Sequence, residues 1–146
     1  MHYRYDKDEL FFLLSGQTMT TLIVCLFIAM IIPYLAKIPV GYAMQKTGHY
    51  DNNYPRVQQS SLQGFGARAA AAHQNAFEAL LLFSCAVLTA LATHNFSTAI
   101  ERLAIAFIIL RVVYHVIYLL NWATLRSTIW FASLICCLSI VWMCIP

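Results

Sequence analysis

The stretch TLIVCLFIAMII, residues 21–32, decides the fold class because it contains neither a charged residue nor a regular alternation of polar and apolar side chains. A strand of a membrane β-barrel would alternate over about ten residues. A helix satisfies its backbone hydrogen bonds within the segment, and about 20 apolar residues in a helix cross roughly 30 Å of hydrocarbon. The run therefore predicts a membrane-spanning helix, which we extend to residues 15–40.

Three further apolar stretches of spanning length follow, at residues 66–92, 98–121 and 127–145. The composition agrees, since 61% of the 146 residues are hydrophobic, against about 45–50% apolar residues in soluble domains. We therefore expect an all-α integral membrane protein, a single domain built as a four-transmembrane-helix bundle. The net charge of +3 is small and scattered, which indicates the lipid bilayer rather than nucleic acid as a partner.

The connections between the spans predict the topology. Residues 36–64 form the only long polar connection and are predicted as a loop, whereas the other two connections are tight and make their helices antiparallel neighbours. The first and third connections then lie on the same side of the membrane, and that side has a slight excess of basic residues. It carries Lys37, Lys46, Arg56 and Arg126, with Arg68 at its edge, whereas the other side carries Arg4, Lys7 and Arg102. This bias predicts a cytoplasmic first connection and, in a bacterium, an inner-membrane protein.

The cysteines and histidines do not indicate a metal site. All five cysteines lie in apolar spans without CxxC spacing, so we interpret them as small packing residues and expect neither a disulfide framework nor bound zinc. Two histidines, His73 and His115, come near Glu78 in the predicted bundle, but their spacing is not that of metal ligands.

Two ionisable residues fall deep within the apolar spans. Glu78 lies ten residues beyond Arg68, and Arg111 lies ten residues before Asn121, so both are predicted about 15 Å from the same face on antiparallel neighbours. An ionisable side chain near mid-bilayer is costly and normally has a partner. We expect these two residues to form an ion pair, either to hold the bundle together or as part of a binding site.

Further polar residues follow helical spacing from these two positions. Arg68, Asn75 and Glu78 share one arc of the second helix, and the third helix carries Arg111, Tyr114, His115 and Tyr118 at i, i+3, i+4 and i+7. Together the two arcs predict one polar pocket that opens toward the first connection and toward Arg126 and Ser127. Taken singly, Asn75 could bond a neighbouring helix and the tyrosines could simply pack.

Three stretches carry a resemblance to a known family: RAAAAHQNAFEALLLF at residues 68–83, NYPR at residues 53–56, and RVVYHVIYLLNWATLRS at residues 111–127. They resemble the MAPEG superfamily, the membrane-associated proteins of eicosanoid and glutathione metabolism, and the chain looks closest to its small bacterial members. The resemblance implies a four-helix bundle assembled as a homotrimer, with glutathione bound between neighbouring protomers near the cytoplasmic face.

The resemblance also implies roles for individual residues. Asn75 and Glu78 would contact the glutathione backbone, Arg111 and Tyr118 would line the site, and Arg126 would lie beside the sulfur with Ser127 as a second thiol partner. Arg68 and His73 match positions of the family motif, Tyr114 stands where the prostaglandin E synthase member has histidine, and Lys37 stands near a basic position at the end of the first helix.

Departures from the family pattern leave the function open. Ala71 and Gln74 are neutral where the eicosanoid-making members have arginines, and Trp130 replaces a tyrosine. The leading interpretation is a membrane glutathione transferase or peroxidase acting on a lipophilic electrophile or a lipid hydroperoxide. The alternative is a non-catalytic lipid-binding or scaffold protein, as one family member is. A small transporter is disfavoured, because one-sided polar residues do not line a path across the membrane.

Overall fold

The computed structural model describes the backbone of residues 7–146 and the side chains from Ser15 onward, and this part of the chain is entirely helical and irregular, without strands. Its elements are α1 (Lys7–Gly48), α2 (Pro55–Ser60), α3 (Phe65–Ala92), α4 (Thr98–Leu119) and α5 (Ala123–Met143). By length and composition, α1 from Ser15, α3, α4 and α5 are able to cross a membrane. The chain is therefore a multi-pass integral membrane protein with a bundle of four long helices.

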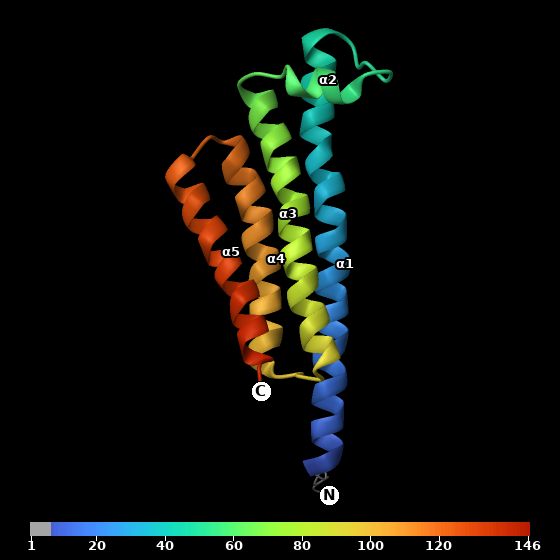
Figure 1. Cartoon of the computed structure of the whole chain (residues 1–146), viewed down its shortest axis with the longest axis vertical. Coiled ribbons are helices and arrows are strands. Elements are labelled where there is room, and N and C mark those ends of the chain that lie inside the picture. Colours follow the sequence, from blue (N-terminus) through green and yellow to red (C-terminus); the bar gives the residue numbers. More distant parts are fainter. Residues whose placement is uncertain (1–6) are drawn as a thin grey trace, which may run out of the picture.

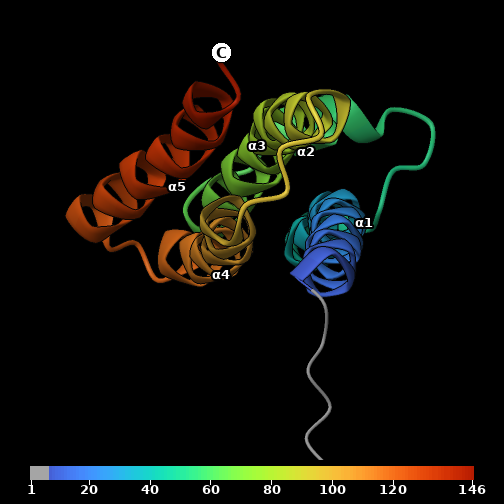
Figure 2. The ribbon, with the colours of Figure 1, turned by 90° about the horizontal axis from the view of Figure 1, so that it is seen from below.

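The four long helices run side by side and alternate in direction (Figure 1). The connection that contains α2 and the α4–α5 turn lie at one end of the bundle, whereas the C-terminus and the α3–α4 connection lie toward the other. Seen along the bundle, α3 and α4 lie between α1 on one side and α5 on the other (Figure 2). The cytoplasmic location of the α2 end stays a prediction from the distribution of basic residues. Two of the residues in that comparison, Arg4 and the side chain of Lys7, lie outside the described residues.

The first helix is longer than predicted, because it continues through Pro33 and Pro39 to Gly48 instead of ending at residue 40. Each proline removes only one backbone N–H from a helix that tertiary packing can still hold. Here the packing is supplied by Val40, Ala43 and Met44, which are buried against Leu62 and Ala69. Their i, i+3, i+4 spacing extends the apolar face beyond the second proline.

The predicted loop between the first two spans is correspondingly shorter and contains the helix α2. Gln58 of α2 ties this segment to the end of α1, since its side-chain N–H group donates to the carbonyl of His49 at 2.8 Å and its side-chain oxygen accepts from the N–H of Asp51 at 2.9 Å. Pro55 begins α2, where its missing N–H costs nothing. The connection is therefore an ordered cap over one end of the bundle.

The last two helices differ from their predicted bounds mainly at the turn that joins them. Helix α4 ends at Leu119, two residues before the predicted end, and α5 begins at Ala123, four residues before the predicted start. Asn121 adopts a positive φ of 63° in this turn, which asparagine tolerates better than most residues. The reversal is therefore completed within Leu120–Trp122.

Small residues and two stacked rings fill the centre of the bundle. Ala69, Ala72 and Ala76 of α3 are buried, and such small residues allow helices to approach closely, but Ala71 is exposed. The rings of Phe83 and Phe107 stack with their centroids 4.1 Å apart and join α3 to α4. Aliphatic residues complete this core, among them the fully buried Leu22, Val87, Ile100 and Ile140.

All five cysteines are free, and four of them, Cys25, Cys136, Cys137 and Cys144, are buried as packing residues. Cys85 is exposed on the outer side of α3, so the packing interpretation is wrong for that residue. Its position between Ser84 and Ala86 placed it in an apolar span, but the span pattern alone did not show which way it faces.

A carboxylate clasp joins α1 to the beginning of α4. The Thr21 hydroxyl donates to one oxygen of Glu101 at 2.8 Å, and the buried Thr18 hydroxyl donates to the other at 3.3 Å. Hydrogen bonds between membrane helices average about 0.6 kcal/mol, and bonds to charged groups reach about 1.5–3 kcal/mol.

We expect Thr21→Val to lower the free energy of unfolding in mild detergent by about 1 kcal/mol, because it removes the shorter bond of this clasp. Thr20→Val is the matched control, since the Thr20 hydroxyl donates only to the Gly16 carbonyl of its own helix. Thermal or denaturant unfolding of both variants measures the difference, and equal losses would contradict a role for the clasp.

Candidate functional site

Arg111 is the largest fully buried side chain among the described residues, with 2% of its surface exposed. Its guanidinium donates to the side-chain oxygen of Asn75 at 2.6 Å and to the hydroxyl of Ser133 at 3.5 Å, and it lies 4.2 Å from the centre of the Tyr114 ring. These partners belong to α3, α5 and α4 respectively. Arg111 therefore joins three helices, and its Nε atom is buried without a hydrogen bond in the described structure.

The predicted direct ion pair between Glu78 and Arg111 is wrong, because Asn75 lies between them. The Asn75 amide N–H group donates to Glu78 at 3.0 Å, while its oxygen accepts from Arg111. The residue count predicted that the two charges lie at one depth, but Glu78 points toward the outer surface of the protomer and is exposed there. Equal depth along two helices does not fix the direction in which each side chain points.

The exposed position of Glu78 is unusual for its depth. Glu78 stands thirteen residues into the 28-residue helix α3, which places it about 20 Å from the helix start, near the middle of the span. A carboxylate at such a depth normally faces protein or water rather than lipid. A single protomer therefore leaves a membrane-embedded charge only partly enclosed.

A second group of predicted residues lies between α4 and α5. The guanidinium of Arg126 lies 4.4 Å from the centre of the Tyr118 ring, and Tyr118 packs edge-on against Tyr114. These three residues, with Ser127, Trp130 and Phe131, line a cavity of about 210 Å³. Because Tyr114 also touches Arg111, an aromatic pair connects the two arginines.

Arg126 stands within the first turn of the last helix and not just before it, where the predicted start at residue 127 had placed it. Helix α5 starts at Ala123, and the backbone N–H of Arg126 already donates to the carbonyl of Trp122 at 2.9 Å. Helical side chains lean toward the N-terminus, so the Arg126 guanidinium still lies beside the first turn. Ser127 donates its hydroxyl proton to the Ala123 carbonyl at 3.1 Å, which leaves its oxygen lone pairs, rather than the proton, available to a ligand.

The remaining predicted residues lie at the α1–α3 side of the bundle. His73 donates from Nδ1 to the Pro33 carbonyl at 2.9 Å, and Lys37 donates to the side-chain oxygen of Gln59 in α2. His73 and Lys37 also line a cavity of about 900 Å³ between α1, α2 and α3. Arg68 lies elsewhere, with its Nε donating to the Leu119 carbonyl at 3.4 Å, and so satisfies one carbonyl at the end of α4.

The structure therefore divides the single predicted pocket into two. The cavity of about 900 Å³ takes its lining from α1, α2 and α3, and the cavity of about 210 Å³ takes its lining from α4 and α5. Asn75 and Glu78 belong to the lining of neither cavity. Within one protomer the ten predicted residues do not converge on one enclosed site.

Sequence reasoning missed three polar residues near these groups. Arg56 and Gln59 of α2 line the larger cavity, and Ser133 of α5 contacts Arg111. The NYPR stretch was a signal for Arg56, but the segment was interpreted as a loop whose position was unknown. Ser133 lies in an apolar span and had no distinguishing neighbour in the sequence.

The two neutral departures from the family motif lie in the larger cavity. Ala71 and Gln74 are both exposed and line it together with Lys37 and Arg56. Within the described residues, no group of three or more His, Cys, Asp or Glu side chains is placed to hold a metal ion. The polar chemistry of both cavities is therefore that of cations, amides and hydroxyls.

These features define a polytopic helical membrane protein with buried and half-buried arginines near one end of its bundle. A model of the MAPEG family matches residues 21–146, and the chain belongs to the MAPEG family. No curated protein and no solved structure matches the chain. Membership places it among membrane proteins of glutathione- and eicosanoid-related function, a family whose members use glutathione as substrate or cofactor.

Proposed function

We propose that this chain is a membrane-bound glutathione-dependent transferase or peroxidase, a single domain that acts on lipophilic electrophiles or lipid hydroperoxides. Its assembly is a homotrimer, its site lies between neighbouring protomers, and in a bacterium it occupies the inner membrane with the α2 end in the cytoplasm. The observation that carries the proposal is the division of the site residues into two surfaces, with the Glu78 carboxylate exposed and outside both cavities.

A cyclic assembly would unite the two surfaces. In a ring, each interface joins two different faces of the chain, so the α1–α3 face of one protomer meets the α4–α5 face of the next. Such an interface brings Lys37 and Arg56 toward the partner's Arg126, and it covers Glu78. The cost of a mid-membrane carboxylate facing lipid is then avoided, which gives a physical reason for the oligomer.

Glutathione fits these residues by charge. Its two carboxylates match the cations of the larger cavity, Lys37 and Arg56, and its ammonium matches Glu78. Arg111 donates to the Asn75 oxygen and so holds the inner end of the Asn75–Glu78 chain. Asn75 orients Glu78 by donating to it, so the carboxylate is held before any ligand arrives.

The residues around the smaller cavity supply the chemical environment. When bound, glutathione contributes a thiol, whose thiolate form is the nucleophile. Arg126 is permanently charged and stabilises a nearby anion, and the Tyr118 ring against which it lies restricts its guanidinium. Trp130 and Phe131 give the cavity apolar walls, which favour a lipophilic second substrate entering from the bilayer.

A non-catalytic lipid-binding protein is the alternative, and two observations favour it. The Ser127 proton is already donated to the Ala123 carbonyl, so this hydroxyl does not stabilise a thiolate without breaking that bond. Ala71 and Gln74 leave the larger cavity with fewer cations than in the eicosanoid-making members. A measurement of glutathione binding distinguishes the transferase or peroxidase from the lipid-binding protein.

Glu78→Gln is expected to weaken glutathione binding about three- to tenfold, because a neutral amide loses the charge-assisted bond to the ligand ammonium. Equilibrium binding to the purified protein measures this change, and mass in mild detergent should stay at three times the 16.5 kDa chain. Glu101→Gln is the matched control: it loosens the α1–α4 clasp but should leave glutathione affinity unchanged. If Glu78→Gln binds normally and only unfolds earlier, Glu78 is structural; a wild-type monomer would contradict the shared site.

Gln74→Arg is expected to tighten glutathione binding by about tenfold, because it adds a cation to the wall of the larger cavity and one charge-assisted hydrogen bond contributes about 1.5–3 kcal/mol. Gln63→Arg adds the same charge at an exposed position outside this cavity and serves as the control. Isothermal titration of both variants tests the idea, which fails if the two substitutions have equal effects.

A further inference from the structure

Ser133 is a buried hydroxyl on a helix face that is otherwise apolar. It is 3% exposed, and the other buried residues of α5 are Cys136, Cys137 and Ile140. Its proton is donated to the Trp130 carbonyl of the same helix at 2.8 Å, and its oxygen accepts from Nη1 of Arg111 at 3.5 Å. The bond to Trp130 therefore turns the hydroxyl toward Arg111 as an acceptor.

Arg111 carries this contact across to α3, because a guanidinium is planar and rigid. While Nη1 points at Ser133, Nη2 donates to the side-chain oxygen of Asn75 at 2.6 Å and to its backbone carbonyl at 3.5 Å. When one end of the planar group is anchored, the other end has fewer directions in which to point. Ser133 therefore restricts the donor that Asn75 meets.

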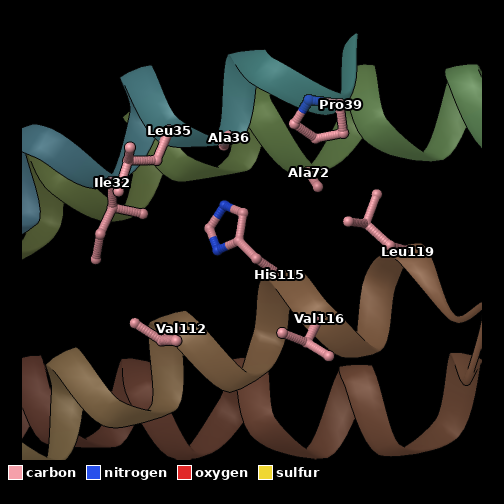
Figure 3. A pocket seen from close by; sticks show the side chains of 9 residues that line it. All are labelled: Ile32, Leu35, Ala36, Pro39, Ala72, Val112, His115, Val116 and Leu119. Carbon is pink, nitrogen blue, oxygen red and sulfur yellow. The ribbon is translucent and has the colours of Figure 1, made fainter. Parts of the chain in front are cut away.

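The backbone of Arg111 is held by a second contact. Nδ1 of His115 contacts the Arg111 carbonyl at 2.7 Å, and Figure 3 shows the His115 ring in the apolar cleft between α1 and α4. Arg111 is not among the residues that line this cleft. Its side chain therefore takes its orientation from the partners on α3 and α5 and from the Tyr114 ring.

Asn75 converts the orientation of Arg111 into a position for Glu78. Arginine only donates hydrogen bonds, so the Asn75 amide presents its oxygen to Arg111 and its N–H group to Glu78, at 3.0 Å from Oε2. This is the one hydrogen bond that the exposed carboxylate makes within the described structure. Oε1 stays available to accept from a ligand.

We propose that Ser133 is a positioning residue for Glu78: it restricts the Arg111 guanidinium, which holds the Glu78 carboxylate in place through Asn75. The inference rests on the proposed function, in which Glu78 binds the ammonium of glutathione. Ser133 lines neither the larger nor the smaller cavity, so it acts on the ligand only through these residues. A purely structural Ser133 would tie α5 to α4 and would affect all ligands alike.

The first test needs no ligand. Isotope labelling of asparagine nitrogen makes the Asn75 side-chain amide visible by nuclear magnetic resonance among the five asparagines of the chain, and Asn75→Asp assigns its signal. Ser133→Ala should shift this signal, because the guanidinium beside the amide is no longer restricted. Ser139→Ala, at a half-buried serine of α5 that lines a separate groove, should not. An unshifted Asn75 signal in Ser133→Ala would overturn the proposal and leave the proposed function standing.

The second test compares glutathione with deaminoglutathione, which lacks the ammonium. The wild type should bind glutathione about three- to tenfold more tightly than the analogue. Ser133→Ala should weaken glutathione binding about threefold, the effect of one average hydrogen bond between membrane helices, and leave binding of the analogue unchanged. Ser133→Thr keeps a hydroxyl and should restore the preference. Equal weakening of both ligands would make Ser133 structural and overturn the proposal.

Further measurements separate the remaining outcomes. In a Glu78→Gln background, Ser133→Ala should have no additional effect on glutathione affinity, and an undiminished threefold loss would overturn the proposal. If Ser133→Ala fails to fold, Ser133→Cys replaces it, because a thiol has a similar volume but is a weak acceptor. A wild type that binds both ligands equally would overturn the ammonium role of Glu78 and this proposal with it, whereas one that binds neither would overturn the proposed function as well.

Discussion

Arg111→Ala is expected to lower the free energy of unfolding by about 3–5 kcal/mol, the largest stability change that we predict for a single substitution. The substitution leaves a cavity where the largest fully buried side chain stood, and it removes the donor to Asn75. It also removes the contact with Ser133, so α3 and α5 lose their shared partner on α4. The oxygen of the half-buried Asn75 amide also loses its partner, which adds a desolvation cost to the lost packing.

Unfolding in mixed micelles, followed by circular dichroism, measures this change, and two further variants separate its causes. Arg111→Met keeps most of the volume without the charge, so it should recover more than half of the stability if packing dominates. Arg102→Ala, on the exposed side of the same helix, should change the stability by less than about 0.5 kcal/mol. Similar losses in Arg102→Ala and Arg111→Ala would show that the buried contacts contribute little.

The helical bundle could be predicted from the sequence because the bilayer allows few kinds of secondary structure. An apolar run of spanning length has one common solution, a helix, and short connections make neighbours antiparallel. The bounds were less predictable where local signals conflicted with packing. The first span was predicted to end at residue 40, but Val40, Ala43 and Met44 continue its buried face and hold the backbone through to Gly48.

The candidate site was predicted less completely, for a geometric reason. Counting residues estimates how deep Glu78 and Arg111 lie along their helices. Counting does not give the rotation of each helix about its axis, and that rotation turns Glu78 outward and places Asn75 between the two charges. The position of α2 against α1 depends on the side chain of Gln58, which no periodic pattern indicates.

The separation of the site residues onto two faces of the protomer also could not be predicted from the sequence. The resemblance to MAPEG proteins named the residues but not the surfaces on which they stand. Lys37 and His73 face the cavity beside α2, whereas Tyr118 and Arg126 face the one beside α5. A pattern in one chain does not distinguish residues that meet within a protomer from residues that meet across an interface.

Arg126→Ala is expected to abolish ionisation of bound glutathione at neutral pH, which is the largest functional effect that we predict. A free thiol has a pKa near 8.5, so only a few per cent is thiolate at pH 7. A guanidinium beside the sulfur, together with the first turn of α5, lowers that pKa by about one to two units, at about 1.4 kcal/mol each. Roughly a quarter to three quarters of the bound thiol should then be ionised in the wild type and only a few per cent in the variant.

Ultraviolet difference spectra detect the thiolate directly when glutathione is added at saturating concentration. The wild type should show the signal, Arg126→Lys should keep part of it because the charge remains, and Arg126→Ala should lose it. Arg56→Ala is the matched control, since Arg56 lines the other cavity: it should weaken binding but leave the ionised fraction of bound glutathione unchanged. Glutathione that binds the wild type without a thiolate signal would contradict the transferase proposal. The bond from Ser127 to Ala123 would then be the feature that matters, because it occupies the hydroxyl proton of the residue next to Arg126 and favours the lipid-binding alternative.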